Sequence, residues 1–116
     1  MSTSDRIAAF DVVVVPFPNS DRLAGKRRPA LVVSNSALAD FGLVWSAMIT
    51  GADNRPWSCD VAIADLGAAG LPAPSVVRPA KVACIEPTRV LRRAGRLAPA
   101  AARKVASRLR GFLAAG

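Results

Sequence analysis

The apolar runs of this chain are short, rich in β-branched residues and closed by proline or glycine. The first, "AAFDVVVVPF" at residues 8–17, holds four consecutive valines and ends at Pro16 and Pro18. β-branched side chains fit a pleated sheet and proline cannot continue a ladder, so this run predicts a strand. Similar runs follow at residues 29–34, 43–50, 58–65 and 75–86, the last with a break at Pro79. Short strands between turn residues predict a small, strongly bent antiparallel barrel or sandwich.

The pattern changes near residue 98. Pro99 suits the first turn of a helix, and apolar residues then recur at helical spacing. These residues are Val105, Leu109, Phe112 and Leu113. We therefore predict a mainly β (α+β) protein with one domain over 1–116, a barrel or sandwich at about 7–90 and a C-terminal helix at about 98–114.

Composition narrows the class of protein. The chain has 116 residues, of which 52% are hydrophobic, so one domain with a packed core is expected. It contains no run of about 18 apolar residues and no secretory signal, which predicts a cytoplasmic protein without a membrane span. There is no histidine, and Cys59 and Cys84 lie far apart. We expect no metal or cofactor, and we expect both cysteines to be reduced and buried.

Positive charge is concentrated at the C-terminal end. Residues 1–88 carry eight Lys/Arg and eight Asp/Glu, a sum of zero, whereas residues 89–116 carry eight Lys/Arg and no acid. Such a region suits an anionic partner, nucleic acid first. It equally suits a solvated helix face. The segment holding Arg92, Arg93 and Arg96 is interpreted as solvated.

A second group of cations precedes a strand, in "GKRRPALVVS" at residues 25–34. Lys26, Arg27 and Arg28 stand directly before Pro29. The residues alone allow two interpretations: an anion-binding loop, or an exposed edge at which Arg28 pairs with Asp21. Thr50 also allows two interpretations: a functional hydroxyl of a site, or a residue that ends a strand at an ordinary turn.

Three segments in order resemble one family. They are "FDVVVVPFPNSDRLAGKRRPALVVS", "LVWSAMITG" and "GLPAPSVVRPAKVACIEPTRV". Together, from about Ile7 to Arg96, they resemble the MazF/PemK toxins of bacterial toxin–antitoxin pairs. The resemblance implies an SH3-like barrel with a C-terminal helix, a homodimer, and metal-independent cleavage of single-stranded RNA.

The resemblance also assigns residues. The arginine before the motif proline falls on Arg28, and the threonine that closes the third strand falls on Thr50; these are the family's usual catalytic pair. Some members carry an aspartate two residues after the position of Arg78, where this chain has Ala80. The sequence therefore predicts no acid–base pair on Arg78 and leaves the general base unassigned.

The chemistry of RNA self-cleavage fits these side chains. The 2′-hydroxyl attacks the adjacent phosphate, leaving a 2′,3′-cyclic phosphate and a 5′-hydroxyl. Arg28 is expected to donate two parallel hydrogen bonds to phosphate, and Thr50 one. The candidate RNA-binding residues are Lys26, Arg27, Arg78, Lys81 and Trp57. Trp45, on an apolar strand, is interpreted as a core residue.

A cytosolic ribonuclease needs a neutralising partner. We expect a small antitoxin whose disordered acidic tail competes with RNA for the cations. The alternative is a non-catalytic RNA-binding or gyrase-poisoning module on the same barrel, because a fold does not fix a function.

Overall fold

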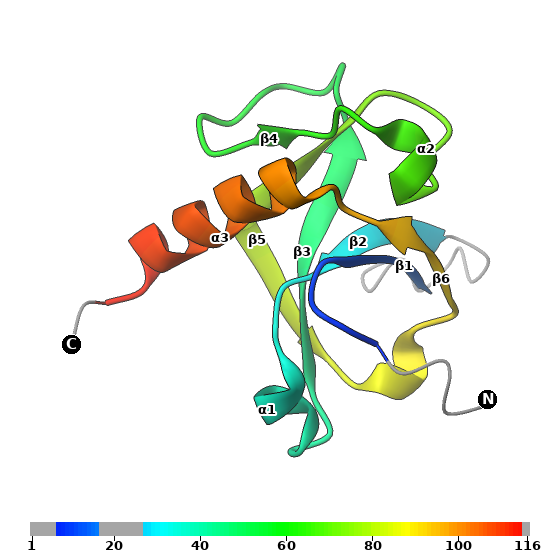
Figure 1. Cartoon of the computed structure of the whole chain (residues 1–116), viewed down its shortest axis with the longest axis vertical. Helices are drawn as coiled ribbons and strands as arrows, with labels where there is room; N and C mark the ends of the chain where they lie inside the picture. The colour runs from blue at the N-terminus through cyan, green and yellow to red at the C-terminus, as the bar shows by residue number, and fades with distance from the viewer. Residues whose placement is uncertain (1–6, 17–26, 115–116) are drawn as a thin grey trace.

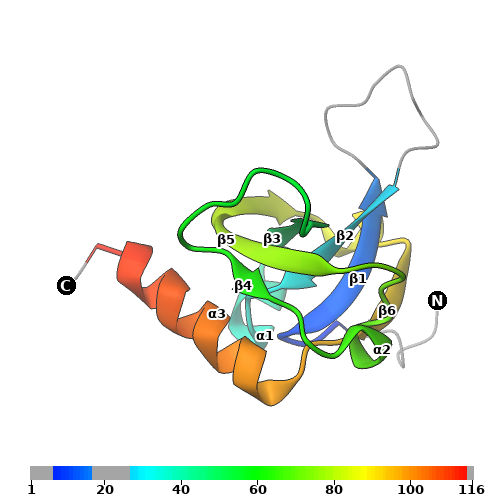
Figure 2. The ribbon, with the colours of Figure 1, turned by 90° about the horizontal axis from the view of Figure 1, so that it is seen from above.

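A computed structural model describes residues 7–16 and 27–114. Within these ranges six strands form one antiparallel sheet, in the order β4-β5-β3-β2-β1-β6. The sheet curls into a half-barrel, and the C-terminal helix α3 lies across it (Figures 1 and 2). The strands are β1 (Asp11–Pro16), β2 (Arg27–Val32), β3 (Val44–Gly51), β4 (Val61–Ala62), β5 (Ser75–Ile85) and β6 (Arg92–Arg96). The helices are α1 (Ser36–Ala39), α2 (Leu66–Ala69) and α3 (Pro99–Phe112), with a 3-10 turn, η2 (Pro87–Arg89).

This architecture confirms the predicted fold class: a small, bent antiparallel sheet with a C-terminal helix. The fourth expected strand, at 58–65, is reduced to the two residues of β4. The elements that were not predicted are α2, capped by the Asp65 side chain and ended by Gly70 at φ 72, the turn η2, and β6. The sheet therefore continues past residue 90, where the sequence placed the end of the barrel.

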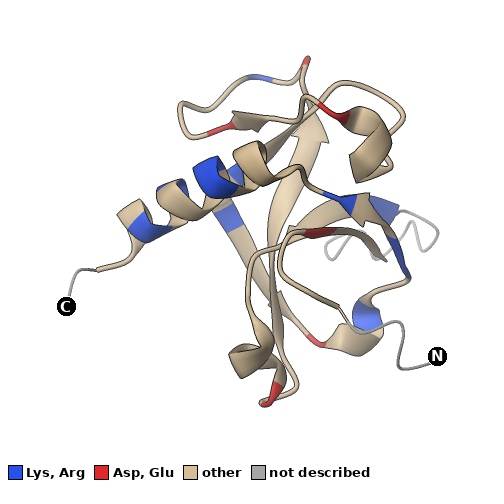
Figure 3. Ribbon diagram, in the orientation of Figure 1, with Lys and Arg blue, Asp and Glu red and all other residues tan. Residues whose placement is uncertain are grey.

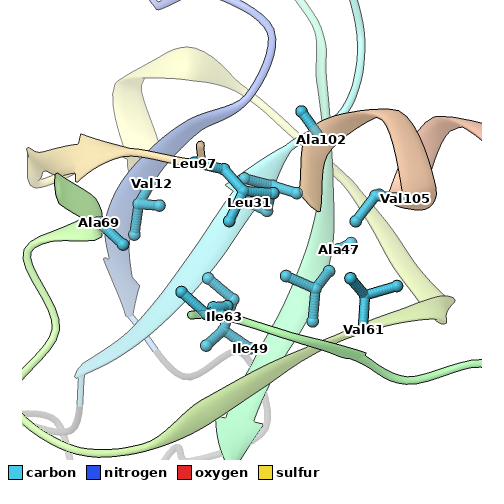
Figure 4. Close-up of a cluster of buried hydrophobic side chains, with 11 residues drawn as sticks. Val12, Leu31, Ala47, Ile49, Val61, Ile63, Ala69, Leu97, Ala102 and Val105 are labelled. Carbon is cyan, nitrogen blue, oxygen red and sulfur yellow. The ribbon is translucent and has the colours of Figure 1, made fainter. Parts of the chain in front are cut away.

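Three of the four valines of β1 belong to two separate apolar clusters. Val12 belongs to the larger cluster, which α3 closes with Ala102 and Val105 (Figure 4). Val13 belongs to a smaller cluster on the other face of the sheet. A strand buried on both faces needs no polar alternation, which explains the unbroken valine run. Each fully buried Val or Leu side chain stabilises the fold by roughly 1.5–3 kcal/mol.

The expected break at Pro79 is a bulge inside β5. Met48 of β3 pairs with Arg78, but the preceding Ala47 pairs with Val82. Residues 79–81 therefore lie outside the regular ladder, where proline, which has no N–H, is tolerated. The bulge redirects the chain between Arg78 and Lys81, two residues that the sequence analysis had assigned to one site.

Buried Asp11 fastens β6 to the sheet. Its carboxylate accepts from Arg96 at 2.8 Å and from Arg93 at 3.3 Å, and from the Ala8 backbone N–H at 2.9 Å. The three arginines of residues 92–96 are exposed, as expected for a solvated segment, but the segment is a strand, which was not predicted. These arginines belong to a strand that pairs with β1. The side chains of Arg93 and Arg96 are half exposed, but their charged ends face a buried acid.

Three further expectations on burial are corrected. Trp45, interpreted as a core residue, is 43% exposed. Cys84 is exposed and Cys59 is partly exposed, although both were expected to be buried; both are free thiols. Each of these residues lies on an outer position of β3 or β5 or in a loop, where an apolar residue type alone does not fix burial. No helix in the described ranges is long and apolar enough to cross a bilayer.

Candidate functional site

The register of the sheet brings the key residues onto one face. Ala30 of β2 pairs with Met48 of β3, and Met48 pairs with Arg78 of β5. Directly paired residues point to the same side, as do residues two apart on one strand. Arg28 and Thr50 lie two residues beyond Ala30 and Met48, so both share this face with Arg78.

A cavity of about 420 Å³ opens beside Arg28 on this face. Three cationic side chains border it: Arg28 from β2, Lys81 from the bulge of β5, and Arg89 from the end of η2. Ser46 and Met48 contribute to its wall. Thr50 lies two residues after Met48 on β3. It is buried, with 7% exposure, and does not itself line the cavity.

The charged residues that line the cavity, within the described part of the chain, are all cationic. The described residues that line it include no aspartate or glutamate. Figure 3 shows blue segments, which mark Lys and Arg, on β2, β5 and η2. Clustered positive charge beside a partly apolar wall favours an anion attached to a flat or apolar body, such as a nucleotide. Arg89 was not predicted, because nothing in its local sequence distinguishes it from the other C-terminal arginines.

Thr50 is held by one well-defined hydrogen bond. The amide Nδ2 of Asn54, in the loop that follows β3, donates to Thr50 Oγ1 at 2.7 Å. Within the described ranges, the Thr50 hydroxyl accepts this bond and donates none. The oxygen is therefore engaged as an acceptor on one side.

Arg78 is buried and bound to an acid. Its Nε donates to Asp60 Oδ1 at 2.9 Å, and its Nη2 donates to Asp60 Oδ2 at 3.0 Å and to the Arg55 carbonyl at 2.9 Å. The ring of Trp57 covers the guanidinium, with 4.4 Å from Cζ to the ring centroid. We call Arg78, Asp60 and Trp57 the Arg78 clamp.

The clamp perturbs both titrating groups. The hydrogen bonds from Arg78 lower the pKa of Asp60 below its ordinary value of 3.8, against the opposing effect of burial, and the Trp57 backbone N–H lowers it further. The hydrogen bonds to Asp60 raise the pKa of Arg78 above its already high ordinary value. Both groups are therefore charged at neutral pH.

The expectation that Arg78 has no carboxylate partner is wrong. Asp60 supplies the acid that Ala80 does not, from a segment 18 residues earlier. The register explains why: Val61 of β4 pairs with Val77 of β5, so Asp60 and Arg78 stand opposite each other one step further along. A correct strand pairing for β4 could have found this contact from the sequence.

The other predicted site residues are placed as follows. Lys81 and Arg28 share the cavity, while Arg27 is exposed at the start of β2. Trp57 is 41% exposed but contacts Arg78 on one ring face. Lys26 and Asp21 lie outside the described residues. Arg78, predicted to bind RNA, donates through Nε and Nη2 to Asp60 and to the Arg55 carbonyl, and its side chain is only 8% exposed.

Metal ligands do not gather in the described part of the chain. No three Asp, Glu, Cys or His side chains lie close enough there to hold an ion. The arrangement offers fixed positive charge and hydroxyl groups.

Comparison with known proteins identifies the family. A family model described as the PemK-like, MazF-like toxin of type II toxin–antitoxin systems matches residues 8–113. The chain belongs to this toxin family. In sequence, no protein of curated function matches the chain significantly.

Solved structures of this toxin family share the fold. A MazE–MazF structure (Form-II) from Deinococcus radiodurans matches with a TM-score of 0.72 at 22% identity, over 95% of this chain and 97% of that one. The Mycobacterium tuberculosis toxin MazF-mt6 matches with a TM-score of 0.68 at 20% identity, over 87% of this chain and 93% of that one. An endoribonuclease in complex with its cognate antitoxin, from a mycobacterial species, matches with a TM-score of 0.70 at 17% identity. The match covers 95% of this chain and 100% of that one.

Proposed function

We propose that this PemK/MazF-like toxin is a sequence-selective, metal-independent endoribonuclease that cleaves single-stranded RNA. The observation that carries the proposal is the cationic cavity of Arg28, Lys81 and Arg89, beside a buried threonine on the same sheet face. Family membership and neighbours named as endoribonucleases support it.

Arg28 and Thr50 are the proposed catalytic residues. The planar guanidinium of Arg28 would donate two parallel bonds to the phosphate under attack by the 2′-hydroxyl. The Thr50 hydroxyl would donate to a further phosphate oxygen as negative charge builds there. The products would be a 2′,3′-cyclic phosphate and a 5′-hydroxyl. Fixed donors of this kind typically contribute about 100- to 1,000-fold each to the rate.

The remaining cations would hold the RNA backbone. Lys81 and Arg89 border the cavity, and Arg27 with Lys26 precedes it in sequence. Trp57 has an exposed ring face on which a base could stack, although its other face covers Arg78. In this proposal Arg78 holds the loop, and does not bind phosphate.

The test is cleavage of a mixed-sequence RNA by the purified protein in EDTA. We expect discrete fragments, and we expect none from a substrate carrying a single 2′-deoxy substitution at the cut site. Cleavage of the 2′-deoxy substrate would point to attack by water and contradict the mechanism. Binding of RNA without fragments would favour the non-catalytic RNA-binding module.

An antitoxin is the second proposed partner. Solved relatives include a MazE–MazF structure and an endoribonuclease with its cognate antitoxin. A disordered tail with interleaved acidic and apolar residues would suit a cavity with cations and an apolar wall. The tail and RNA should compete, which a titration of the neighbouring gene's product into the cleavage assay would show. We place both partners, and this toxin, in the cytoplasm.

We also propose a homodimer. A second hollow of about 720 Å³ lies between α3 and residues of β3 and β5, with exposed Trp45, Val82, Phe112 and Leu113 around it. Exposed apolar clusters of this kind are typical of association surfaces. Light scattering should give twice the chain mass, and Trp45→Glu should give the monomer mass. A monomeric wild-type protein at high concentration would contradict the dimer.

A further inference from the structure

The hydrogen bond between Asn54 and Thr50 constrains the direction of the Thr50 proton. A hydroxyl has one donor hydrogen and two acceptor lone pairs. With Nδ2 of Asn54 donating into one lone pair at 2.7 Å, the hydroxyl hydrogen must point away from Asn54. Thr50 lies on the sheet face that carries Met48 and Arg28, so this leaves the proton available to an acceptor on that face.

The loop that carries Asn54 is tied down at several points. Arg78 binds the carbonyl of Arg55, the residue after Asn54, and the carboxylate of Asp60. Arg108 of α3 donates to the carbonyl of Cys59 at 2.9 Å. The Asn54 backbone N–H also donates to the Gly51 carbonyl at 3.1 Å. The backbone of the loop that carries Asn54 is thus held by β5, α3 and the turn after β3.

We propose that Asn54 is a positioning residue: it holds the Thr50 hydroxyl as a donor directed toward the phosphate bound by Arg28. The Arg78 clamp keeps the Asn54 loop in place. This inference rests on the proposed ribonuclease function and names a residue that acts through Thr50. It also gives the buried Arg78 an indirect part in the reaction, because the same guanidinium fixes the backbone next to Asn54.

Asn54→Asp tests the proposal because it has nearly the same shape and the opposite hydrogen-bond polarity. A carboxylate cannot donate, so Thr50 would donate to it and turn its proton away from the phosphate. We expect kcat to fall about 100-fold, as for the loss of Thr50 itself. Asn54→Ala removes the constraint without reversing it, and should lower kcat only about 5-fold.

Two controls separate orientation from charge and from folding. Ala52→Asp adds the same negative charge in the same exposed loop but lacks contact with Thr50, so it should raise KM for RNA with little change in kcat. In a Thr50→Ala background, Asn54→Asp and Asn54→Ala should each change kcat by about 2-fold or less. Melting temperatures of the Asn54 variants should stay near that of the wild-type protein, since the side chain is exposed.

The outcomes are distinct. Equal kcat for Asn54→Asp and Asn54→Ala would overturn the positioning role, as would an undiminished Asn54→Asp effect in the Thr50→Ala background. In either case the wild-type protein would still cleave RNA, and the proposed function would stand. If the wild-type protein fails to cleave, the proposed function fails and this inference fails with it.

Discussion

Two arginines that precede prolines, Arg28 and Arg78, lie on the same face of one curled sheet and have different surroundings. Arg28, before Pro29 on β2, borders a cavity together with Lys81 and Arg89. Arg78, before Pro79 on β5, is buried against Asp60 and under the ring of Trp57. The same dipeptide thus contributes to a cationic cavity in one place and to a closed ion pair in the other.

The difference teaches that the opposite strand decides what an arginine does. Asp60 reaches Arg78 because β4 pairs with β5 and sets the two residues opposite each other. A guanidinium bound on two edges by a carboxylate and a carbonyl has few donors left for phosphate. The comparison therefore predicts a functional division: Arg28 acts on RNA, and Arg78 holds the loop beside Thr50.

The largest expected effect follows from removing Arg28. Arg28→Ala should lower the cleavage rate by about 100-fold or more, because an oriented donor pair to the transition state is lost. Its melting temperature should stay close to the wild-type value, since the side chain is only partly buried. Arg92→Ala on β6 is the control: Arg92 is also a strand arginine, exposed and outside the cavity, and this variant should cleave normally. Near-normal cleavage by a folded Arg28→Ala variant would contradict the assignment of Arg28 to RNA cleavage.

Removing Asp60 should affect stability first. Asp60→Ala leaves the buried guanidinium of Arg78 without its carboxylate, so we expect a clearly lowered melting temperature. Cleavage by the folded fraction should fall only about 5-fold, through loosening of the Asn54 loop. The double variant Asp60→Leu with Arg78→Met should recover stability, because apolar residues tolerate burial without a partner. A double variant no more stable than Asp60→Ala would mean that the pair is not the source of the loss.

The two arginines also illustrate which features could be predicted from the sequence and which could not. The valine run, the prolines and the helical spacing after Pro99 were enough to predict most strands, α3 and the fold class. The segment 92–96, with three arginines and a glycine, carries no strand pattern; only its pairing with β1 and the buried Asp11 make it β6. Arg28 could be singled out by its motif, but the partner of Arg78 depended on the register of a two-residue strand. Local sequence does not determine such long-range pairing.

Acid should weaken the Arg78 clamp in a defined pH range. The pKa of Asp60 is lower in the folded protein than its ordinary value of 3.8. Its contribution to stability is therefore complete above that value and is lost as pH falls through the folded pKa. In denaturant titrations, the free energy of unfolding of the wild-type protein should exceed that of Asp60→Asn at neutral pH. This difference should shrink as pH falls below 3.8. A stability difference that stays constant through this range would exclude Asp60 as the titrating group.

The smallest effect concerns the neighbouring cation in the cavity. Lys81→Ala should weaken RNA binding at low salt and reduce the log–log salt slope by about 0.7, the value for one phosphate contact on single-stranded nucleic acid. Arg78→Lys, whose position lies outside the cavity, should leave the slope unchanged. Fluorescence anisotropy with a 2′-deoxy-substituted RNA gives both slopes. An unchanged slope for Lys81→Ala would place the RNA backbone elsewhere.

The most direct measurement follows the arginine Nε–H groups by NMR while an uncleavable 2′-deoxy-substituted RNA is added. Signals are assigned with Arg28→Lys and Arg78→Lys. We predict that the Arg28 signal shifts and saturates with the RNA, while the Arg78 signal, held by Asp60, stays in place. A shift of the Arg78 signal with the Arg28 signal unmoved would contradict the account.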